Sequence, residues 1–176
     1  MLESSVTDSH IPSDILNTTR AANLPRPALC RAWTDAYRTH AFHHCPVIEQ
    51  KDLYTSSSSS LLQLSICIVG NLKRHDLSGP KLAQEFYEKV KVLIAVNYEQ
   101  DSIQLLKIFC LMSCWSGKPS NPICLDLPEH WIGIAARLIL QVGLHQESAY
   151  TKLADTRCLR RIFWSIHVSR LPVTSR

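Results

Sequence analysis

The sequence predicts an all-α protein. Its patterned segments repeat apolar side chains every three or four residues, and no segment shows the strict alternation typical of a half-buried strand. Proline and glycine residues flank these segments at positions where helices commonly begin or end. The chain has 176 residues, of which 45% are hydrophobic and 19% charged, so it is long enough for one globular domain with a sizeable core.

The first 28 residues differ in composition from the rest of the chain. They are rich in Ser, Thr, Asn and Pro without a sustained period, so residues 1–28 are expected to form a mobile leader. The first expected helix begins at Leu29, reaches about His44 and ends before Pro46. Its apolar stripe consists of Leu29, Trp33, Ala36, Tyr37 and Ala41.

A serine-rich run at 55–60 is expected to be a linker, with Ser60 as the N-cap of the next helix. The apolar run at 61–71 has the length of a buried strand as well as that of a short helix. Because its neighbours on both sides show helical periods, we favour a helix, which Gly70 and Asn71 are expected to close.

Two further helices are expected at about 81–98 and 101–117. The first follows a Ser-Gly-Pro turn, and Glu85 and Lys89 on its outer side have the spacing of a favourable ion pair. Its inner face consists of Leu82, Phe86, Val90, Leu93 and Asn97.

The clearest helical pattern lies at 128–142. Pro128 suits a first turn, Gly143 can adopt the left-handed conformation that ends a helix, and Leu144 can fold back onto the last turn. The face of this helix consists of Trp131, Ile134, Ala135, Leu138 and Val142. A last helix over about 154–170 is expected to bury Leu159, Ile162, Phe163 and Ile166.

The sequence predicts no catalytic, cofactor-binding or metal-binding residue. It lacks a nucleophile motif and a phosphate-binding glycine loop, so we do not expect an enzyme. The cluster His40, His43, His44 and Cys45 lacks identifiable further ligands for zinc. His145 follows a helix end, and we favour a capping or packing role over that of a general base.

The charge and the cysteine content indicate which partners and which cellular compartment to expect. The net charge of +4 is spread along the chain, and the arginines that follow Asp155 are expected to flank a solvated helix rather than to form a nucleic-acid patch. The seven cysteines form no C-x-x-C pair, and the polar N-terminus is unlike a secretory signal, so reduced thiols inside the cell are expected. The apolar run at 61–70 has about half the length of a membrane span.

Three segments together resemble the fungal-specific transcription factor domain, the middle homology region of binuclear zinc-cluster regulators. They are SIQLLKIFCLMSCWSGKPSNP, HWIGIAARLILQVGLHQE and RCLRRIFWSIHVSR. The positions that match the family's motifs are Trp131, Ala135, Arg137, Gly143, Leu144, His145, Arg160, Arg161 and Trp164. The turn CWSGKPSNP and the upstream FYEKVKVLIAVNYEQDSIQ are most similar to the cutinase transcription factor branch.

The resemblance implies a nuclear, non-catalytic helical domain that regulates transcription. Residues 29–169 would form the N-terminal part of this domain, incomplete at its C-terminal end, with 170–176 as a tail. Family members bind zinc and DNA through a separate cysteine cluster that the cysteine spacing here does not supply, so no cofactor is expected in this chain. Protein partners or a homodimer are compatible with this assignment, and the effector is unknown. The alternative is a free-standing interaction module that pairs with full-length relatives, and a small all-α enzyme is a remote third.

Overall fold

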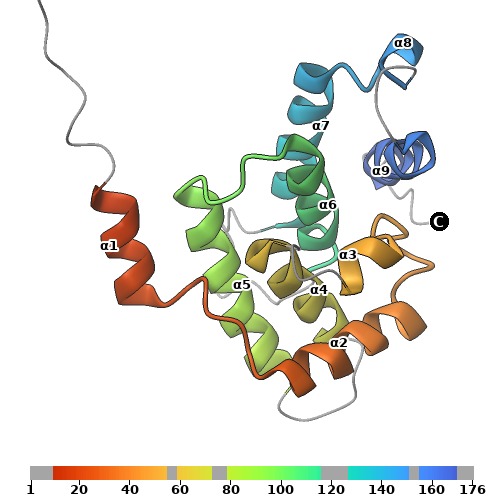
Figure 1. Ribbon diagram of the computed structural model, residues 1–176. Coiled ribbons are helices and arrows are strands. Elements are labelled where there is room, and N and C mark those ends of the chain that lie inside the picture. Colours follow the sequence, from red (N-terminus) through yellow and green to blue (C-terminus); the bar gives the residue numbers. More distant parts are fainter. Residues whose placement is uncertain (1–9, 55–58, 73–78, 116–126, 151–154, 170–176) are drawn as a thin grey trace, which may run out of the picture.

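A computed structural model describes residues 10–54, 59–72, 79–115, 127–150 and 155–169. Every regular element in these ranges is a helix, which confirms the prediction of an all-α protein (Figure 1). The helices are α1 (His10–Thr19), α2 (Pro27–His40), α3 (Gln50–Tyr54), α4 (Ser60–Leu72), α5 (Gly79–Ala95), α6 (Ser102–Met112), α7 (Pro128–Val142), α8 (Glu147–Tyr150) and α9 (Thr156–Ser169).

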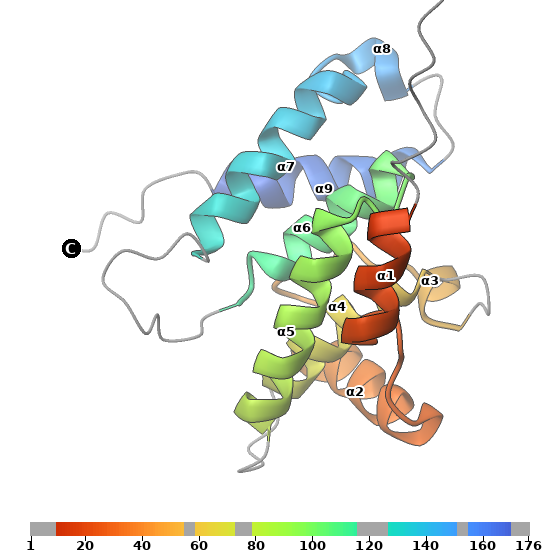
Figure 2. The same ribbon diagram turned by 90° about the vertical axis from the view of Figure 1, so that its left-hand side faces the viewer.

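The helices form two groups that share one core. In the first group α4 packs against α2 and α5, and in the second α6 packs against α7 while α9 contacts both. Contacts between α4 and α6 join the two groups. The turned view in Figure 2 shows α7 and α9 beyond one end of α5, whereas α2 lies near its other end. The apolar side chains of both groups belong to a single buried cluster.

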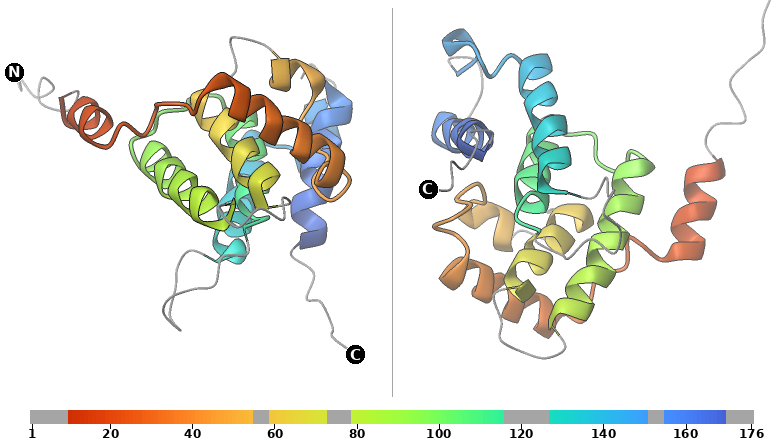
Figure 3. Two further views of the ribbon diagram at one scale, coloured as in Figure 1. Left: turned by 90° about the horizontal axis from the view of Figure 1, so that it is seen from below. Right: turned by 180° about the vertical axis from the view of Figure 1, so that it is seen from behind.

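The N-terminal segment differs from the expected leader, because residues 10–19 form helix α1. This helix lies at the periphery in both views of Figure 3. Leu16 packs against the core, and Ala21, just after the helix, is fully buried. The sequence shows little of this docking because only scattered apolar positions, Leu16, Ala21 and Ala22, carry it.

Helix α2 agrees with the predicted apolar stripe in its middle and differs from the prediction at both ends. Trp33 and Tyr37 are buried on the expected stripe, but Leu29, the first residue of that stripe, is 41% exposed. The helix ends at His40 rather than His44, and a turn of residues 41–44 follows. Leu29 lies in the first turn of α2, where the neighbouring helices do not cover it.

Helix α4 corrects the role expected for Gly70. The helix continues to Leu72, so Gly70 lies inside it and does not close it. A Cβ atom at this position would lie 2.0 Å from the backbone oxygen of Trp33 in α2. Gly70 therefore permits the close approach of two helices. The N-cap is Ser59 rather than Ser60, since the Ser59 carbonyl accepts the first helical hydrogen bond, from the Gln63 amide at 3.0 Å.

Helices α5 and α6 agree with the sequence in their main features. The expected pair Glu85–Lys89 is formed at 3.2 Å on α5. Asp101 caps α6, because its carboxylate accepts hydrogen bonds from the amides of Ile103 and Gln104. Helix α6 ends at Met112, earlier than expected, and the expected end at residue 117 lies outside the described residues.

Helix α7 ends as the sequence predicts. Gly143 has a φ of +80°, its amide bonds to Leu140, and the amide of Leu144 bonds to the carbonyl of Ile139 at 3.0 Å. These two bonds, with a fully buried Leu144, form a Schellman cap. The buried face is rotated from the expected one: it consists of Trp131, Ile132, Ala135 and Ile139, whereas Ile134, Leu138 and Val142 are only partly buried. The contacts of α7 with both α6 and α9 determine which of its apolar residues are buried.

Candidate functional site

The last helix, α9, combines a buried face with an exposed apolar one. Cys158, Leu159, Ile162 and Ile166 are buried, and Phe163 is partly buried against the core. Trp164 and Val168 lie one turn apart on the opposite side and are 58% and 59% exposed. Tryptophan is enriched at surfaces that contact other proteins.

The two motif arginines on α9 form ion pairs that attach the helix to the rest of the domain. Arg161 donates to the carboxylate of Glu49 at 3.0 Å, and Arg160 pairs with Glu147. The guanidinium of Arg160 also lies 5.3 Å from the ring centre of Tyr150 in α8. Both arginines therefore orient α9 against its neighbours.

A small network of charges continues from Glu49. Lys51 pairs with Glu49 at 2.9 Å and with Asp155, which directly precedes α9. Hydrogen bonding with Glu49 and then with Lys51 lowers the pKa of Asp155 to about 2. The start of α9 is thus held electrostatically to α3 and to Glu49, the residue before it.

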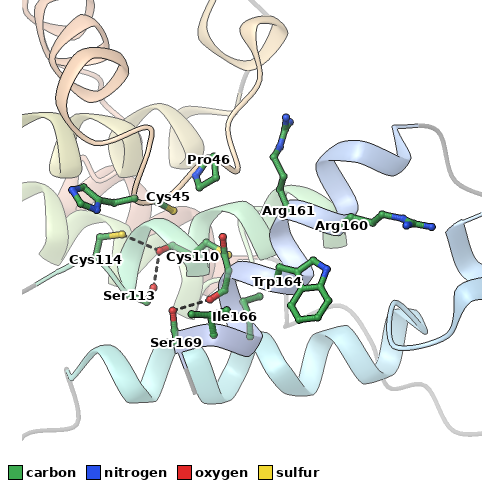
Figure 4. A pocket seen from close by; sticks show the side chains of 13 residues that line it. Cys45, Pro46, Cys110, Ser113, Cys114, Arg160, Arg161, Trp164, Ile166 and Ser169 are labelled. Atoms are coloured by element: carbon green, nitrogen blue, oxygen red, sulfur yellow. Dashed lines mark hydrogen bonds between the residues drawn. The ribbon is translucent and has the colours of Figure 1, made fainter. Parts of the chain in front are cut away.

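Next to the motif residues lies a hollow of about 420 Å³, enclosed by α9, the C-terminal end of α6 and the turn before α3 (Figure 4). Cys45, Cys110 and Cys114 line its base, and Trp164 and Arg160 stand at its α9 side. A hydrogen bond with Cys114 and burial raise the pKa of Cys45, and burial raises that of Cys110. Cys45 and Cys110 therefore stay protonated, so this arrangement favours contact with an apolar group over nucleophilic attack.

The motif residues of α7 serve packing. The Trp131 indole donates a hydrogen bond to the hydroxyl of Tyr87 at 2.8 Å, and Ala135 is fully buried. Arg137 and His145 are exposed, and the His145 ring lies 3.2 Å from the side-chain amide of Gln146. The structure thus places Trp131 and Ala135 in the core, whereas Arg137 and His145 face outward.

The structure contains a buried ion pair that the sequence patterns did not predict. The ammonium of Lys107 in α6 lies 2.8 Å from the carboxylate of Asp52 in α3, and each side chain is only 4% exposed. The same carboxylate accepts a hydrogen bond from the backbone amide of Glu49 at 2.8 Å. A lone lysine within the apolar run LLKIFCLM is the signal that would have indicated a buried partner.

The histidine cluster shows no geometry suited to a metal. His43 and His44 lie side by side, with 4.0 Å between ring centres, and both are exposed, as is His40. Among the described residues, no three His, Cys, Asp or Glu side chains are arranged to hold a metal ion. Throughout the described residues, the helices lack the length and apolar character that a bilayer crossing requires.

Comparison with known proteins places the chain among fungal transcription regulators. The sequence profile of the fungal specific transcription factor domain matches residues 34–169. The chain is 25% identical over 156 residues to the acetamidase regulatory protein of Aspergillus oryzae, an alignment that covers 82% of this chain and 20% of that protein. It is 27% identical over 173 residues to cutinase transcription factor 1 alpha of Fusarium vanettenii, covering 89% of this chain and 19% of that protein.

A second protein of Fusarium vanettenii, cutinase transcription factor 1 beta, is 30% identical over 84 residues, which is 47% of this chain and 9% of that protein. The chain spans about 20% of the length of the relatives that it matches over most of its own length. No solved structure matches it.

The all-helical fold and the family profile over residues 34–169 define a helical domain of the transcription-factor class. The chain belongs to the family of the fungal specific transcription factor domain. The predicted resemblance to this family and to its cutinase transcription factor branch is confirmed.

Proposed function

We propose that this chain acts in the nucleus in the regulation of transcription, as part of the regulatory region of a zinc-cluster regulator. Residues 29–169 would form the N-terminal part of that region, and a separate zinc cluster would contact DNA. The family profile over residues 34–169 supports this assignment, as do relatives named as a regulatory protein and as transcription factors.

The observation that carries the proposal is the exposed face of α9. Arg160 and Arg161 are engaged in ion pairs and the buried face of α9 packs against the core, so Trp164 and Val168 stand on a docked helix beside the hollow of about 420 Å³. Aromatic anchors next to a pocket are typical of protein–protein contacts. The domain would therefore regulate through a protein partner, not as an enzyme. A free-standing module that pairs with full-length relatives would use the same face.

A reporter assay tests the proposal. The full chain, fused to an unrelated DNA-binding domain, is expected to change transcription from a promoter that carries the matching site. A double substitution of Trp164→Ala and Val168→Ala is expected to reduce that change by about tenfold if the face contributes about 1.4 kcal/mol to partner binding. Tyr98→Ala, at an exposed aromatic residue between α5 and α6, is the matched control and should leave the output unchanged.

Reporter output equal to that of the DNA-binding domain alone would contradict the proposal. Equal output from the wild type and the double variant would support regulation of transcription by the chain but would refute a role of the α9 face in it. Coexpression with a full-length relative separates the alternative, since a pairing module is expected to be captured by that relative and to lose capture with the double substitution.

A further inference from the structure

A cavity of about 690 Å³ lies between α2, α3 and α4. The residues that line it come from these three helices and from the segment that precedes α2. Pro27, Arg31 and Thr34 follow one another at intervals of about one helical turn, so they share one face of α2. Gln63 and Ile66 supply the wall from α4 with the same spacing. The cavity is therefore built from regular helix faces and is separate from the exposed face of α9.

The walls of this cavity are mostly apolar. Leu24 and Pro25 line it from the segment before α2, Leu53 lines it from α3 and Ile66 from α4. Because Leu24 is 39% exposed, part of this apolar lining is accessible from solvent. Pockets of this size, with mostly apolar walls and a few polar groups, bind small organic molecules.

Two hydrogen-bond donors of α2 line the cavity one turn apart. Within the described residues, neither the guanidinium of Arg31 nor the hydroxyl of Thr34 has a hydrogen bond or an ion pair. Arg31 is exposed and Thr34 is partly buried, so both donors can be reached by a ligand that enters from solvent. A guanidinium can donate two parallel hydrogen bonds to a carboxylate, and a neighbouring hydroxyl can donate a further one.

The other charged side chains of the lining already have partners. Both carboxylate oxygens of Asp52 accept hydrogen bonds from the ammonium of Lys107, at 3.0 and 2.8 Å. Asp35 is 61% exposed and lies 3.9 Å from the guanidinium of Arg38. Arg31 is therefore the charge of this lining that lacks an opposite partner among the described residues, and a complementary ligand carries a negative charge.

We propose that this cavity is a reversible binding site for a small carboxylic acid with an apolar body. The carboxylate accepts hydrogen bonds from the guanidinium of Arg31 and the hydroxyl of Thr34. The apolar body lies against the side chains of Leu53 and Ile66. The polar pair fixes the orientation of the ligand, and the apolar walls exclude water from its body. The site is distinct from the α9 face, and the proposal does not depend on a role in transcription.

Titration of the purified full chain with cyclohexylacetate, followed by the backbone amide resonances in NMR spectra, tests the proposal. The shifts are expected to saturate and to be largest for lining residues of α2, α3 and α4, not for residues of the hollow beside α9. Cyclohexylacetamide has the same shape without the charge. It should bind more weakly by about tenfold or more, because it cannot form the charge-assisted hydrogen bonds.

Three variants sharpen this test, and the NMR spectra also report whether each of them is folded. Arg31→Gln should weaken cyclohexylacetate binding by about tenfold or more, since it removes the charge that pairs with the carboxylate. Thr34→Val keeps the shape and removes the hydroxyl, so it should weaken binding by about threefold to tenfold. Arg26→Gln is the matched control, at an exposed arginine outside the lining, and should change the dissociation constant by less than about twofold.

A fourth variant is expected to act in the opposite direction. Asp35 lies four residues after Arg31 on the same helix and lines the cavity, so its carboxylate repels an anionic ligand. Asp35→Asn should therefore strengthen cyclohexylacetate binding, by about twofold because this side chain is exposed. Weaker binding by Asp35→Asn would contradict an anionic ligand.

The proposal would be overturned by any of three further results. These are the absence of saturable shifts at the lining residues, equal affinity for cyclohexylacetate and cyclohexylacetamide, and an unchanged dissociation constant in Arg31→Gln. None of these measurements depends on the reporter assay, so the carboxylate site and the role of the α9 face are tested separately.

Discussion

The indole nitrogen of Trp131 donates a hydrogen bond to the phenolic oxygen of Tyr87 across 2.8 Å, which joins α7 to α5 inside the protein. The same tyrosine ring stacks on Trp115 with 4.7 Å between ring centres, and the Trp131 ring stacks on Phe109. Trp131 therefore links α5, α6 and α7 in one aromatic cluster, which Trp115, three residues after the end of α6, joins through Tyr87. The buried tryptophan of α7 therefore serves the packing between helices.

Replacing Trp131 by Ala is expected to lower the free energy of unfolding by about 3–5 kcal/mol, since it removes a large buried side chain and leaves a cavity. Trp164→Ala is the matched control, because Trp164 is 58% exposed, and we expect a change within about 0.5 kcal/mol. Urea unfolding followed by circular dichroism measures both. Equal losses for the two variants would contradict the burial of Trp131.

Two glycines inside helices are expected to respond oppositely to Ala. At Gly70 the added methyl group would overlap the Trp33 carbonyl at 2.0 Å, so we expect a loss of about 1–3 kcal/mol in unfolding free energy. At Gly133 no heavy atom lies within 4 Å, so the higher helix propensity of Ala should add about 0.5–1 kcal/mol. Thermal melting of both variants distinguishes a crossing contact from a helix preference. Stabilisation by both substitutions would show that α2 and α4 do not approach this closely.

Gly70 and Gly143 show what the sequence can and cannot specify. Gly143 ends α7 as predicted, because a cap is a local arrangement that depends on its own backbone bonds. Gly70 has the same local appearance, an apolar helix followed by Gly-Asn, but a residue of another helix decides its role. The rotated face of α7 has the same cause, since two neighbouring helices select which apolar residues are covered.

In the candidate site too, local features could be predicted from the sequence, whereas contacts between helices could not. The inward residues of α9 followed from its period, and Trp164, which lies outside that predicted set, is 58% exposed. The ion pair of Lys107 with Asp52 and the hydrogen bond of Trp131 to Tyr87 join residues far apart in the chain. No period or spacing reports such pairs, which depend on how the helices cross.

Removing only the cation of the buried ion pair is expected to destabilise the fold, whereas replacing both partners by neutral residues is expected to destabilise it much less. Lys107→Met leaves the Asp52 carboxylate buried without its cation, so we expect a loss of about 3–5 kcal/mol in unfolding free energy. Adding Asp52→Asn removes the charge and retains an acceptor for the Glu49 amide, and this double variant should recover most of that loss. Chemical denaturation of the two variants and the wild type measures the difference. A double variant as unstable as the single one would refute a dominant role of the uncompensated charge.

The charge network at the start of α9 predicts an acid-dependent stability. Bonding with Glu49 and Lys51 lowers the pKa of Asp155 to about 2 from the ordinary 3.8, so the folded state binds this proton less tightly than the unfolded chain. The resulting stabilisation is present above the ordinary pKa and is lost as the pH falls through about 2. Asp155→Asn should therefore lower stability near neutral pH, and its difference from the wild type should shrink in acid.

The control for this measurement is Asp35→Asn, at a carboxylate that is 61% exposed and lies 3.9 Å from Arg38. Such a surface pair contributes little, so this variant should follow the wild-type profile at every pH. Melting temperatures across an acid series give the comparison. A constant difference between Asp155→Asn and the wild type down to the lowest pH would contradict the lowered pKa.

The purified chain is expected not to select a DNA sequence. Sequence selection requires side chains presented to base edges by an element docked in a groove. The most arginine-rich described helix, α9, faces the protein with its apolar side, and its Arg160 and Arg161 already pair with Glu147 and Glu49. Any remaining affinity should come from phosphate contacts, which weaken steeply as salt rises and do not depend on sequence.

Titration of the full chain against a duplex from a candidate target promoter and a scrambled duplex, at low and at physiological salt, measures this directly. The two duplexes should bind equally, and both should lose most of their affinity at the higher salt, because released counterions no longer favour the complex. Added zinc should change nothing, since the described residues hold no group of metal-binding side chains. Replacing Arg157, an exposed residue of α9, by Gln should weaken both duplexes alike. A zinc-dependent, salt-resistant preference for one duplex would instead assign a DNA-reading element to this chain.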